Sequence, residues 1–255
     1  MDILSVLAVL VLSYLIGAIP FGWIIVKLTT GRDIRSIESG RTGGTNAMRA
    51  AGTLAGVFTA IGDVTKGLST AWLVTWIVPA ETPWRVWLQV AAPIMAIMGH
   101  NYSIYLLERR EDGKVTFRGG AGGATCFGGA MGLWPFVGLA ILPVGLLVFL
   151  LVGFASLTTL SIAITTIAVF AYLAIIKGYP WQFILYGVAS LLILMWALRP
   201  NLVRLAKGTE RAVGLRAYLA KRKAAAAAPS AAQSSQVTQP ARKSSRLKIQ
   251  ASTEK

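Results

Sequence analysis

The sequence predicts an all-α integral membrane protein, a polytopic bundle of about seven transmembrane helices. Three observations carry this prediction. The 255 residues are 55% hydrophobic and 14% charged, with a mean hydropathy of +0.63. Residues 3–26 carry no charge, and roughly 20 apolar residues are enough to cross a hydrocarbon core about 30 Å thick. Most cations lie between apolar stretches or after the last one, as the positive-inside rule requires.

The first element, residues 3–26, is predicted to be a span and not a signal peptide. Asp2 stands where a signal peptide carries a positive charge, and the first cations, Lys27 and Arg32, follow the apolar run. The run is also longer than the hydrophobic region of a signal peptide. We therefore expect this segment to stay in the membrane.

The later spans are predicted from five further apolar stretches, at residues 52–79, 87–107, 124–152, 157–176 and 181–198. The third of these is ambiguous. Unbroken, it gives six spans and places the basic loop that begins at Asn201 opposite the other basic loops. A break near Trp134 and Pro135 gives seven spans, with the N-terminus outside and the C-terminus cytoplasmic.

The seven-span alternative agrees better with the positive-inside rule. It leaves Arg85 and Lys177 as the only cations on the outer face. The cations it places inside are Arg32, Arg35, Arg41, Arg49, Arg109, Arg110, Lys114 and Arg118. No repeat of fixed period stands out, so an inverted-repeat transporter is not favoured.

The C-terminal segment differs in kind from the rest. Residues 224–253 are rich in Ala, Ser and Gln and lack aromatic side chains, a composition typical of disorder. We predict a membrane domain at residues 1–215 and a basic, disordered cytoplasmic tail at residues 216–255. The tail could associate with anionic lipid, although a solubilising role is the simpler interpretation.

Charge and cysteine content narrow the function classes. The net charge is +15, but its placement around apolar stretches indicates lipid headgroups and phosphate as partners, and not nucleic acid. A single cysteine, Cys126, excludes intramolecular disulfides and cysteine-based zinc cages, and is most simply a packed residue.

A first glycine-rich loop follows the first span. Glycine lets several backbone N–H groups turn toward one point, and hydroxyl and amide groups beside them complete a cradle for phosphate oxygens. Arg49 follows closely and can make a bidentate contact. An ordinary interhelical turn uses the same residue types, so this loop alone does not distinguish a phosphate-binding loop from such a turn. Its residues are Ser39, Gly40, Thr42, Gly43, Gly44, Thr45 and Asn46.

A second glycine-rich loop favours the phosphate interpretation. Arg118 precedes Gly119, Gly120, Gly122 and Gly123 at the predicted cytoplasmic mouth of a span. The helix that follows directs its positive dipole end toward the same water layer. Two anion cradles on one face predict two phosphates. A third polar stretch, residues 199–210, is by itself an ordinary positively charged flank of a span.

Three ionisable residues lie within apolar stretches. Asp63 and Lys66 are three residues apart and share a helical face, so we expect an ion pair with a structural role. His100 is the only histidine. A lone imidazole is more often a packing residue than a base, but its place near the cytoplasmic end of a span keeps it eligible.

Taken in order, these segments resemble the motifs of one bacterial family, the acyl-phosphate:glycerol-3-phosphate acyltransferases, PlsY. The resemblance covers residues 1 to about 215. Residues 13–22, SYLIGAIPFG, closely resemble the family's first span, and residues 39–46 match its S-G-N-x-G-A-T-N loop at most positions. Residues 63–67 fit D-x-x-K-G, Gly99 and His100 begin the second motif, residues 118–125 parallel K-G-G-K-G-V-A-T, and Asn201 with residues 208–210 is similar to the C-terminal motif.

The resemblance implies transfer of a fatty acyl group from acyl phosphate to sn-glycerol 3-phosphate, which begins phospholipid synthesis at the bacterial inner membrane. It implies substrate contacts for Arg49 and Arg118, which together with His100 we predict to be the catalytic residues. The substrate-binding residues that it implies are Ser39, Gly40, Gly43, Thr45, Asn46, Gly119, Gly120, Gly122, Ser156 and Asn201.

The chemistry implied by the resemblance needs little from the protein. Acyl phosphate already contains a good leaving group, so we predict no covalent enzyme intermediate, no metal and no cofactor. The departing phosphate or His100 accepts the hydroxyl proton. The expected partners are the two substrates and the bilayer, and the sequence leaves open an acyl-phosphate-synthesising partner.

The chain departs from the family pattern at several positions. Ala121 replaces a lysine, Arg41 an asparagine, Gly153 an arginine and Leu198 a histidine, and residues 108–116 lengthen the loop before the second cradle. Weaker activity, a changed acceptor, or compensation by Arg41 and Lys114 are the alternatives. A rival from another class is a non-catalytic or transport protein that binds anionic lipid.

Overall fold

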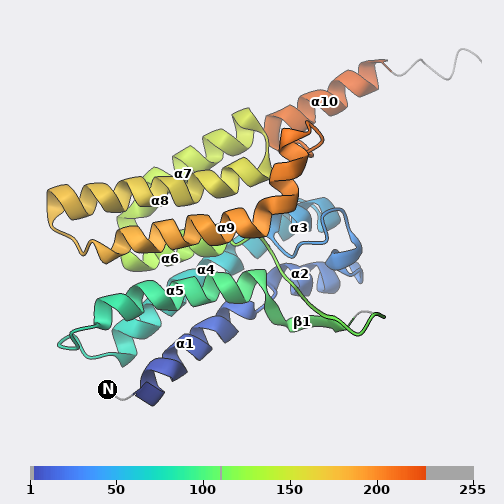
Figure 1. Ribbon diagram of the computed structural model, residues 1–255. Coiled ribbons are helices and arrows are strands. Elements are labelled where there is room, and N and C mark those ends of the chain that lie inside the picture. The colour runs from blue at the N-terminus through green and yellow to red at the C-terminus, as the bar shows by residue number, and fades with distance from the viewer. Residues whose placement is uncertain (1–2, 110, 228–255) are drawn as a thin grey trace, which may run out of the picture. The chain divides into compact units, whose positions relative to one another are not determined.

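The computed structural model describes residues 3–109 and 111–227 (Figure 1). The disorder predicted for residues 216–255 is wrong for residues 216–227, which belong to a helix. The rest of that predicted tail lies outside the described residues, as does Arg110. The chain divides into two units, Met1–Ala217 and Tyr218–Lys255, and the site lies in the first of them.

Helices make up most of the first unit, with one β-hairpin. The elements are α1 (Ile3–Ala18), α2 (Phe21–Thr30), η1 (Ile34–Ser36), α3 (Gly44–Ala51), α4 (Thr53–Ile77), α5 (Arg85–Asn101), β1 (Ser103–Arg109), β2 (Val115–Arg118), α6 (Gly123–Leu133), η2 (Pro135–Val137), α7 (Gly138–Leu147), η3 (Val148–Val152), α8 (Ala155–Lys177) and α9 (Gln182–Ala206). Helix α10 (Gly214–Ala227) begins in the first unit and ends in the second.

Four helical segments in the described part of the chain are long and apolar enough to cross a membrane: Ile3–Thr30, Pro135–Val152, Ala155–Lys177 and Gln182–Ala206. The helical, membrane-type fold that the sequence predicts is thereby confirmed. The count of seven spans and the orientation of the termini stay predictions.

The first apolar run is not one helix. Helix α1 ends at Ala18 and α2 begins at Phe21, because Pro20 has no N–H and cannot continue the hydrogen-bond ladder. The carbonyl of Ile19, left at the break, accepts a hydrogen bond from Lys66 Nζ at 3.0 Å. The break thus supplies a partner for a cation buried in α4.

The span predicted over residues 87–107 is wrong after residue 101, because the chain there leaves the helix and forms a strand. The helix ends at Asn101, and β1 pairs antiparallel with β2, with Glu108 opposite Thr116 and an irregularity between Ser103 and Leu107. The Ser103 hydroxyl donates to the carbonyl of Ala18 at 2.6 Å. This bond fastens the start of the hairpin to the end of α1.

The break predicted near Trp134 and Pro135 is confirmed. Helix α6 ends at Leu133, and Pro135 begins the short helix η2 that leads into α7. Proline suits this position because a first helical turn needs no N–H from it. The chain then passes through the π-helix η3 and the left-handed Gly153, with φ of 73°, into α8.

The loop predicted to begin at Asn201 is helical. Helix α9 continues to Ala206 with Pro200 inside it. Proline removes the N–H that would bond the carbonyl of Trp196, and that carbonyl instead accepts from Arg199 Nε at 3.0 Å. Asn201 is therefore held on a rigid helix, and the turn comes only after residue 206.

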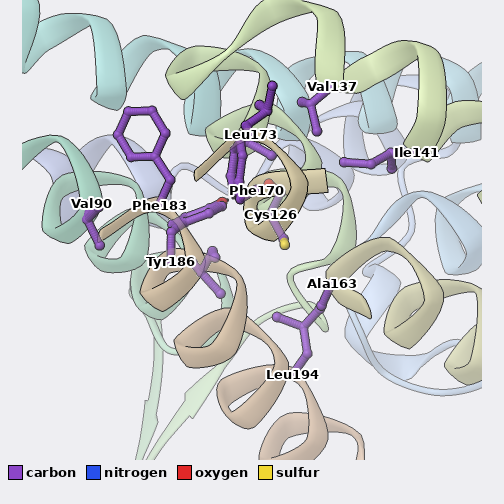
Figure 2. Packing of buried hydrophobic residues seen from close by; sticks show 12 residues of the cluster. Val90, Cys126, Val137, Ile141, Ala163, Phe170, Leu173, Phe183, Tyr186 and Leu194 are labelled. Atoms are coloured by element: carbon purple, nitrogen blue, oxygen red, sulfur yellow. Dashed lines mark hydrogen bonds between the residues drawn. The ribbon is translucent and has the colours of Figure 1, made fainter. Parts of the chain in front are cut away.

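A buried apolar cluster joins α5, α6, α7, α8 and α9 (Figure 2). The rings of Phe170, Phe183 and Tyr186 pack together, with the first two centroids 5.5 Å apart. The Tyr186 hydroxyl donates to the carbonyl of Cys126 at 2.7 Å. Cys126 is a buried free thiol, as predicted.

Helices α4 and α6 approach each other through glycine. A side chain at Gly67 would collide with the carbonyl of Thr125, and one at Gly128 with the carbonyl of Val64. Backbone atoms cannot move aside as a flexible side chain can. This close approach brings the polar residues of α4 next to the second glycine loop.

We therefore expect Gly128→Ala to destabilise the protein. The added methyl group overlaps the backbone of α4, which costs roughly 1–3 kcal/mol. Heat-inactivation midpoints in detergent measure the effect. Gly138→Ala is the matched control, because a methyl group there meets no atom closer than 3.6 Å. Equal midpoints for the two variants would contradict the close packing.

Candidate phosphate and acyl-chain pocket

Asn46 gives the first glycine loop its shape. Its Nδ2 donates to the carbonyls of Ile34, Ile37 and Arg41 at 3.3, 3.0 and 2.8 Å. The side chain is buried, and its Oδ1 has no hydrogen-bond partner among the described residues. The donor side of this predicted substrate contact is thus used inside the loop itself.

Asp33 and Gly40 set the course of the first glycine loop. Asp33 caps η1, and its bidentate hydrogen bond with Arg35 lowers the pKa of the carboxyl to about 2. Gly40 has φ of 66°, a left-handed conformation that favours glycine. The chain then enters α3, which carries Thr45 and Arg49.

The two glycine loops contact each other directly, although about 75 residues separate them in the sequence. The N–H of Thr42 donates to the carbonyl of Gly119 at 3.3 Å, and Arg41 Nη1 donates to the carbonyl of Gly120 at 3.4 Å. The N–H of Gly120 in turn donates to the carbonyl of His100 at 3.0 Å. The prediction that both loops share one face is confirmed.

A buried group of three ionisable side chains supports the second loop. Lys66 Nζ lies 2.9 Å from Asp63 Oδ1, which confirms the predicted ion pair, and His100 Nδ1 lies 3.4 Å from the same oxygen. A side chain at Gly120 would collide with His100 Nε2. The imidazole therefore fits between Asp63 and the backbone of the loop, and Gly120 has to be glycine.

A polar chain of residues joins the loops to α8 and α9. Glu210 accepts from the Ser156 hydroxyl at 2.7 Å and from Asn201 Nδ2 at 3.1 Å. Asn201 Oδ1 accepts from Arg41 Nη2 at 3.3 Å. The sequence predicted Ser156 and Asn201 as site residues but not Glu210. Its position in the C-terminal motif, residues 208–210, could have indicated it.

These elements enclose a pocket of about 790 Å³. Its polar end is formed by the first loop, α3, Gly122, and the ends of α8 and α9, and it carries Arg41, Arg49, Arg204 and Arg211. Its other part is apolar and is lined from α4, α6, α7, η3 and α8 by Val57, Val64, Phe127, Ile141, Leu142, Leu146, Phe149 and Ile162. A polar head and a hydrocarbon chain fit this division.

Most of the predicted site residues line this pocket. They are Ser39, Gly43, Thr45, Asn46, Arg49, His100, Gly122, Ser156 and Asn201. Gly40, Arg118, Gly119 and Gly120 do not belong to the lining. The Arg118 side chain pairs with Glu108 at 3.0 Å, half-exposed on β2. Gly119 and Gly120 act through backbone hydrogen bonds to Thr42 and His100.

The polar end of the pocket has excess positive charge. Glu38 pairs with Arg211, and Asp63 pairs with Lys66. Burial lowers the pKa of the Arg49 guanidinium, an effect that Glu210 partly offsets. Burial and the charge of Arg204 lower the pKa of Arg41. Arginine nevertheless stays protonated in proteins, so both guanidinium groups are cations that favour an anionic ligand.

Comparison with known proteins identifies similar chains. A model of the family described as glycerol-3-phosphate acyltransferase matches residues 7–208. Glycerol-3-phosphate acyltransferase 3 of Dehalococcoides mccartyi is 34% identical over 218 residues, which are 83% of this chain and 97% of the relative. A glycerol-3-phosphate acyltransferase of Thermus thermophilus is 36% identical, over 82% of this chain and 95% of the relative.

Two solved structures are also similar. The crystal structure of PlsY, an integral membrane glycerol 3-phosphate acyltransferase, in its glycerol 3-phosphate form, aligns with a TM-score of 0.69 and 29% identity, covering 84% of this chain and 98% of that one. The lysophosphatidic acid form of the same protein aligns with a TM-score of 0.67, 28% identity and the same coverage.

The role of Asn46 can be tested by Asn46→Ala. If its amide holds the loop, the variant loses the hydrogen bonds of both N–H groups to loop carbonyls and its heat-inactivation midpoint falls, because an unsatisfied buried carbonyl costs roughly 1–3 kcal/mol. Ser39→Ala is the control, since Ser39 is exposed in the same loop. An unchanged midpoint with a raised KM would identify Asn46 as a substrate contact only.

Proposed function

The chain belongs to the glycerol-3-phosphate acyltransferase family, and on that premise we propose that its acyl donor is an acyl phosphate. The enzyme acylates the primary hydroxyl of sn-glycerol 3-phosphate and forms 1-acylglycerol 3-phosphate. One observation carries the proposed donor: a single pocket joins an arginine-rich polar end to an apolar slot. An acyl phosphate has this same division between an anionic head and a hydrocarbon chain.

Both substrates carry a phosphate, and the polar end offers donors for two. Thr45 lies in the first turn of α3 and Arg49 in its last turn, and Ser39 lies before the helix in the loop. We assign Arg49 to a phosphate because a guanidinium binds phosphate oxygens bidentately. Gly43 and Gly122 let backbone approach closely at the two sides of the pocket.

The reaction follows from bringing the two substrates together. The glycerol hydroxyl attacks the acyl carbonyl carbon, a C–O ester bond forms, and the bond from carbonyl carbon to phosphate oxygen breaks, releasing inorganic phosphate. Positioning of this kind can supply roughly 7–11 kcal/mol of the barrier reduction. Cations fixed near the leaving phosphate stabilise its developing charge further. The hydroxyl proton passes to the departing phosphate or to His100.

The geometry limits what His100 can do. Nδ1 faces Asp63, and Nε2 lies against Gly120 at the edge of the pocket. A proton could be accepted only at Nε2 and only from a hydroxyl on the side of Gly120. The residue also holds the second loop through its backbone carbonyl, which accepts from the N–H of Gly120 and which a side-chain substitution leaves in place.

The two candidate acceptors of the hydroxyl proton, the departing phosphate and His100, predict different results for His100→Gln. If the departing phosphate takes the proton, the variant keeps the wild-type shape of the pH–rate profile, whatever its rate. If His100 is the base, kcat falls by roughly 10²–10⁴-fold and the profile loses one limb. Retention of full turnover at every pH would exclude the histidine base.

The remaining predicted residues take supporting roles in this proposal. Gly40, Gly119 and Gly120 shape the two loops, and Arg118 with Glu108 fixes the hairpin beside them. Arg118 reaches a substrate only if this pair opens. We further propose seven spans in the bacterial inner membrane, an outer N-terminus, a cytoplasmic pocket, and a membrane domain that ends before the basic tail at residues 216–255.

The proposed activity is tested with purified protein in lipid. We expect palmitoyl phosphate to release inorganic phosphate only when glycerol 3-phosphate is present, with palmitoyl-CoA inactive as donor. Arg49→Ala should lower kcat/KM at least about 100-fold, because it removes a charged contact in a partly buried site. Arg32→Ala is the matched control, since Arg32 is exposed and is absent from the pocket lining.

Other outcomes identify the alternatives. Turnover with palmitoyl-CoA would keep the family activity and overturn the proposed donor. Phosphate release that needs neither glycerol 3-phosphate nor Arg49 would contradict the proposed reaction. Binding of anionic lipid without any turnover would favour the non-catalytic protein that the sequence left as a rival.

A further inference from the structure

Arg41 occupies a central position in the pocket. Its guanidinium donates to the carbonyl of Gly120 at 3.4 Å, to the carbonyl of Ala197 at 2.5 Å and to Asn201 Oδ1 at 3.3 Å. It therefore touches the second glycine loop and α9 while it belongs to the first loop. Three different elements fix the place of one cation.

The positive charge of Arg41 is not neutralised by these contacts. Its three acceptors are two backbone carbonyls and an amide oxygen, and in the described part of the chain none of its hydrogen-bond partners is a carboxylate. A guanidinium has five N–H donors, so two remain for a ligand. Glu210, which Asn201 separates from Arg41, is a carboxylate whose charge favours the protonated guanidinium, but it also accepts hydrogen bonds from Ser156 and Asn201. The half-buried Arg41 therefore still gains from an added anion.

A second cation, on an exposed residue, lines the same pocket as Arg41. Arg204, one turn after Asn201 on α9, also lines the pocket, and its charge disfavours the protonated form of Arg41. Two like charges at one end of a pocket repel each other in the empty protein. An anion placed near both relieves this repulsion and gains from both charges.

The lining residues next to these contacts are uncharged. Ala121 follows Gly120, and Leu198 follows Ala197. Ala121 and Leu198 stand where the family pattern has a lysine and a histidine, and the sequence offered Arg41 and Lys114 as compensating cations. Lys114 lies on the hairpin turn, where it is exposed and pairs with Asp112 at 3.6 Å. Of these two cations, only Arg41 belongs to the pocket lining.

We propose that Arg41 and Arg204 form a second phosphate-binding subsite, distinct from Arg49, that takes the phosphate group of one of the two substrates. That the subsite binds an anion is inferred from the contacts of Arg41 and the pocket lining. That the anion is a substrate phosphate rests on the proposed function. The ligand class is a phosphate monoester or acyl phosphate. Arg41 positions this group against the second loop while Arg49 holds the other phosphate from α3.

The experiment compares Arg41→Gln and Arg204→Gln with wild-type protein, with Arg32→Gln as the control for loss of an exposed arginine. The measurements are the KM of glycerol 3-phosphate, the KM of palmitoyl phosphate, and the inhibition constant of inorganic phosphate. We expect both variants to raise the same constant by roughly tenfold to a hundredfold. Arg41→Lys, which keeps the charge, should recover part of the loss.

The constants distinguish the two sources of phosphate. A rise in the KM of glycerol 3-phosphate alone assigns the subsite to the acceptor. A joint rise for palmitoyl phosphate and inorganic phosphate assigns it to the donor and its leaving group. If all three constants stay at wild-type values while kcat or the heat-inactivation midpoint falls, Arg41 only joins the loops to α9 and the subsite is overturned.

The subsite can also be tested if the proposed reaction fails. Inorganic phosphate should protect the wild-type protein against heat inactivation, and this protection should be lost in Arg41→Gln and kept in Arg32→Gln. Equal protection in both variants would overturn the subsite whether or not the protein turns over palmitoyl phosphate.

Discussion

Two backbone hydrogen bonds fix the glycine loops: the N–H of Thr42 donates to the carbonyl of Gly119 and joins the loops, and the N–H of Gly120 donates to the carbonyl of His100 and fastens the second loop to α5. The polar end of the pocket depends on them, because its lining residues come from segments far apart in the sequence. The contacts need bare backbone. A side chain at Gly119 would collide with the carbonyls of His100 and Asn101, and one at Gly120 would collide with the His100 ring.

The ionisable residues inside α4 and α5 serve this arrangement. A charged side chain at membrane depth is costly unless it is paired, and Lys66 satisfies the requirement twice, through Asp63 and through the carbonyl freed at the Pro20 break. Asp63 then orients His100, which supports Gly120. The irregularity in the first apolar run and the geometry of the second glycine loop are thus parts of one buried network.

The sequence predicted the helical membrane fold, the break before Pro135 and the Asp63–Lys66 pair, because each depends on local hydropathy, proline chemistry or helical spacing. It mistook the hairpin at Ser103 for a span, since the apolar residues of a half-buried strand also satisfy a hydropathy window. The helical state of Asn201 was missed because Pro200 normally ends a helix, whereas here the carbonyl of Trp196 that it leaves unpaired accepts from Arg199 and α9 continues.

At the site, too, local sequence patterns predicted some features and missed those that depend on long-range contacts. Residue type and glycine spacing predicted Arg49, Ser39 and Thr45, which line the pocket. They could not show that Asn46 bonds its own loop or that Arg118 pairs with Glu108. The position of Arg41 was equally hidden, because its partners lie 79 and 160 residues away in the sequence. Long-range contacts of this kind follow from the packing of α4, α6 and α9, which no local pattern encodes.

The most direct test of this account is a structure with a non-hydrolysable acyl phosphonate bound. We expect the phosphonate at the arginine-rich end, within hydrogen-bond distance of at least one of Arg41 and Arg49, and the acyl chain in the slot lined by Val57, Leu142 and Ile162. A chain bound instead in the groove of Met98, Leu192 and Trp196, with its head away from both glycine loops, would contradict it.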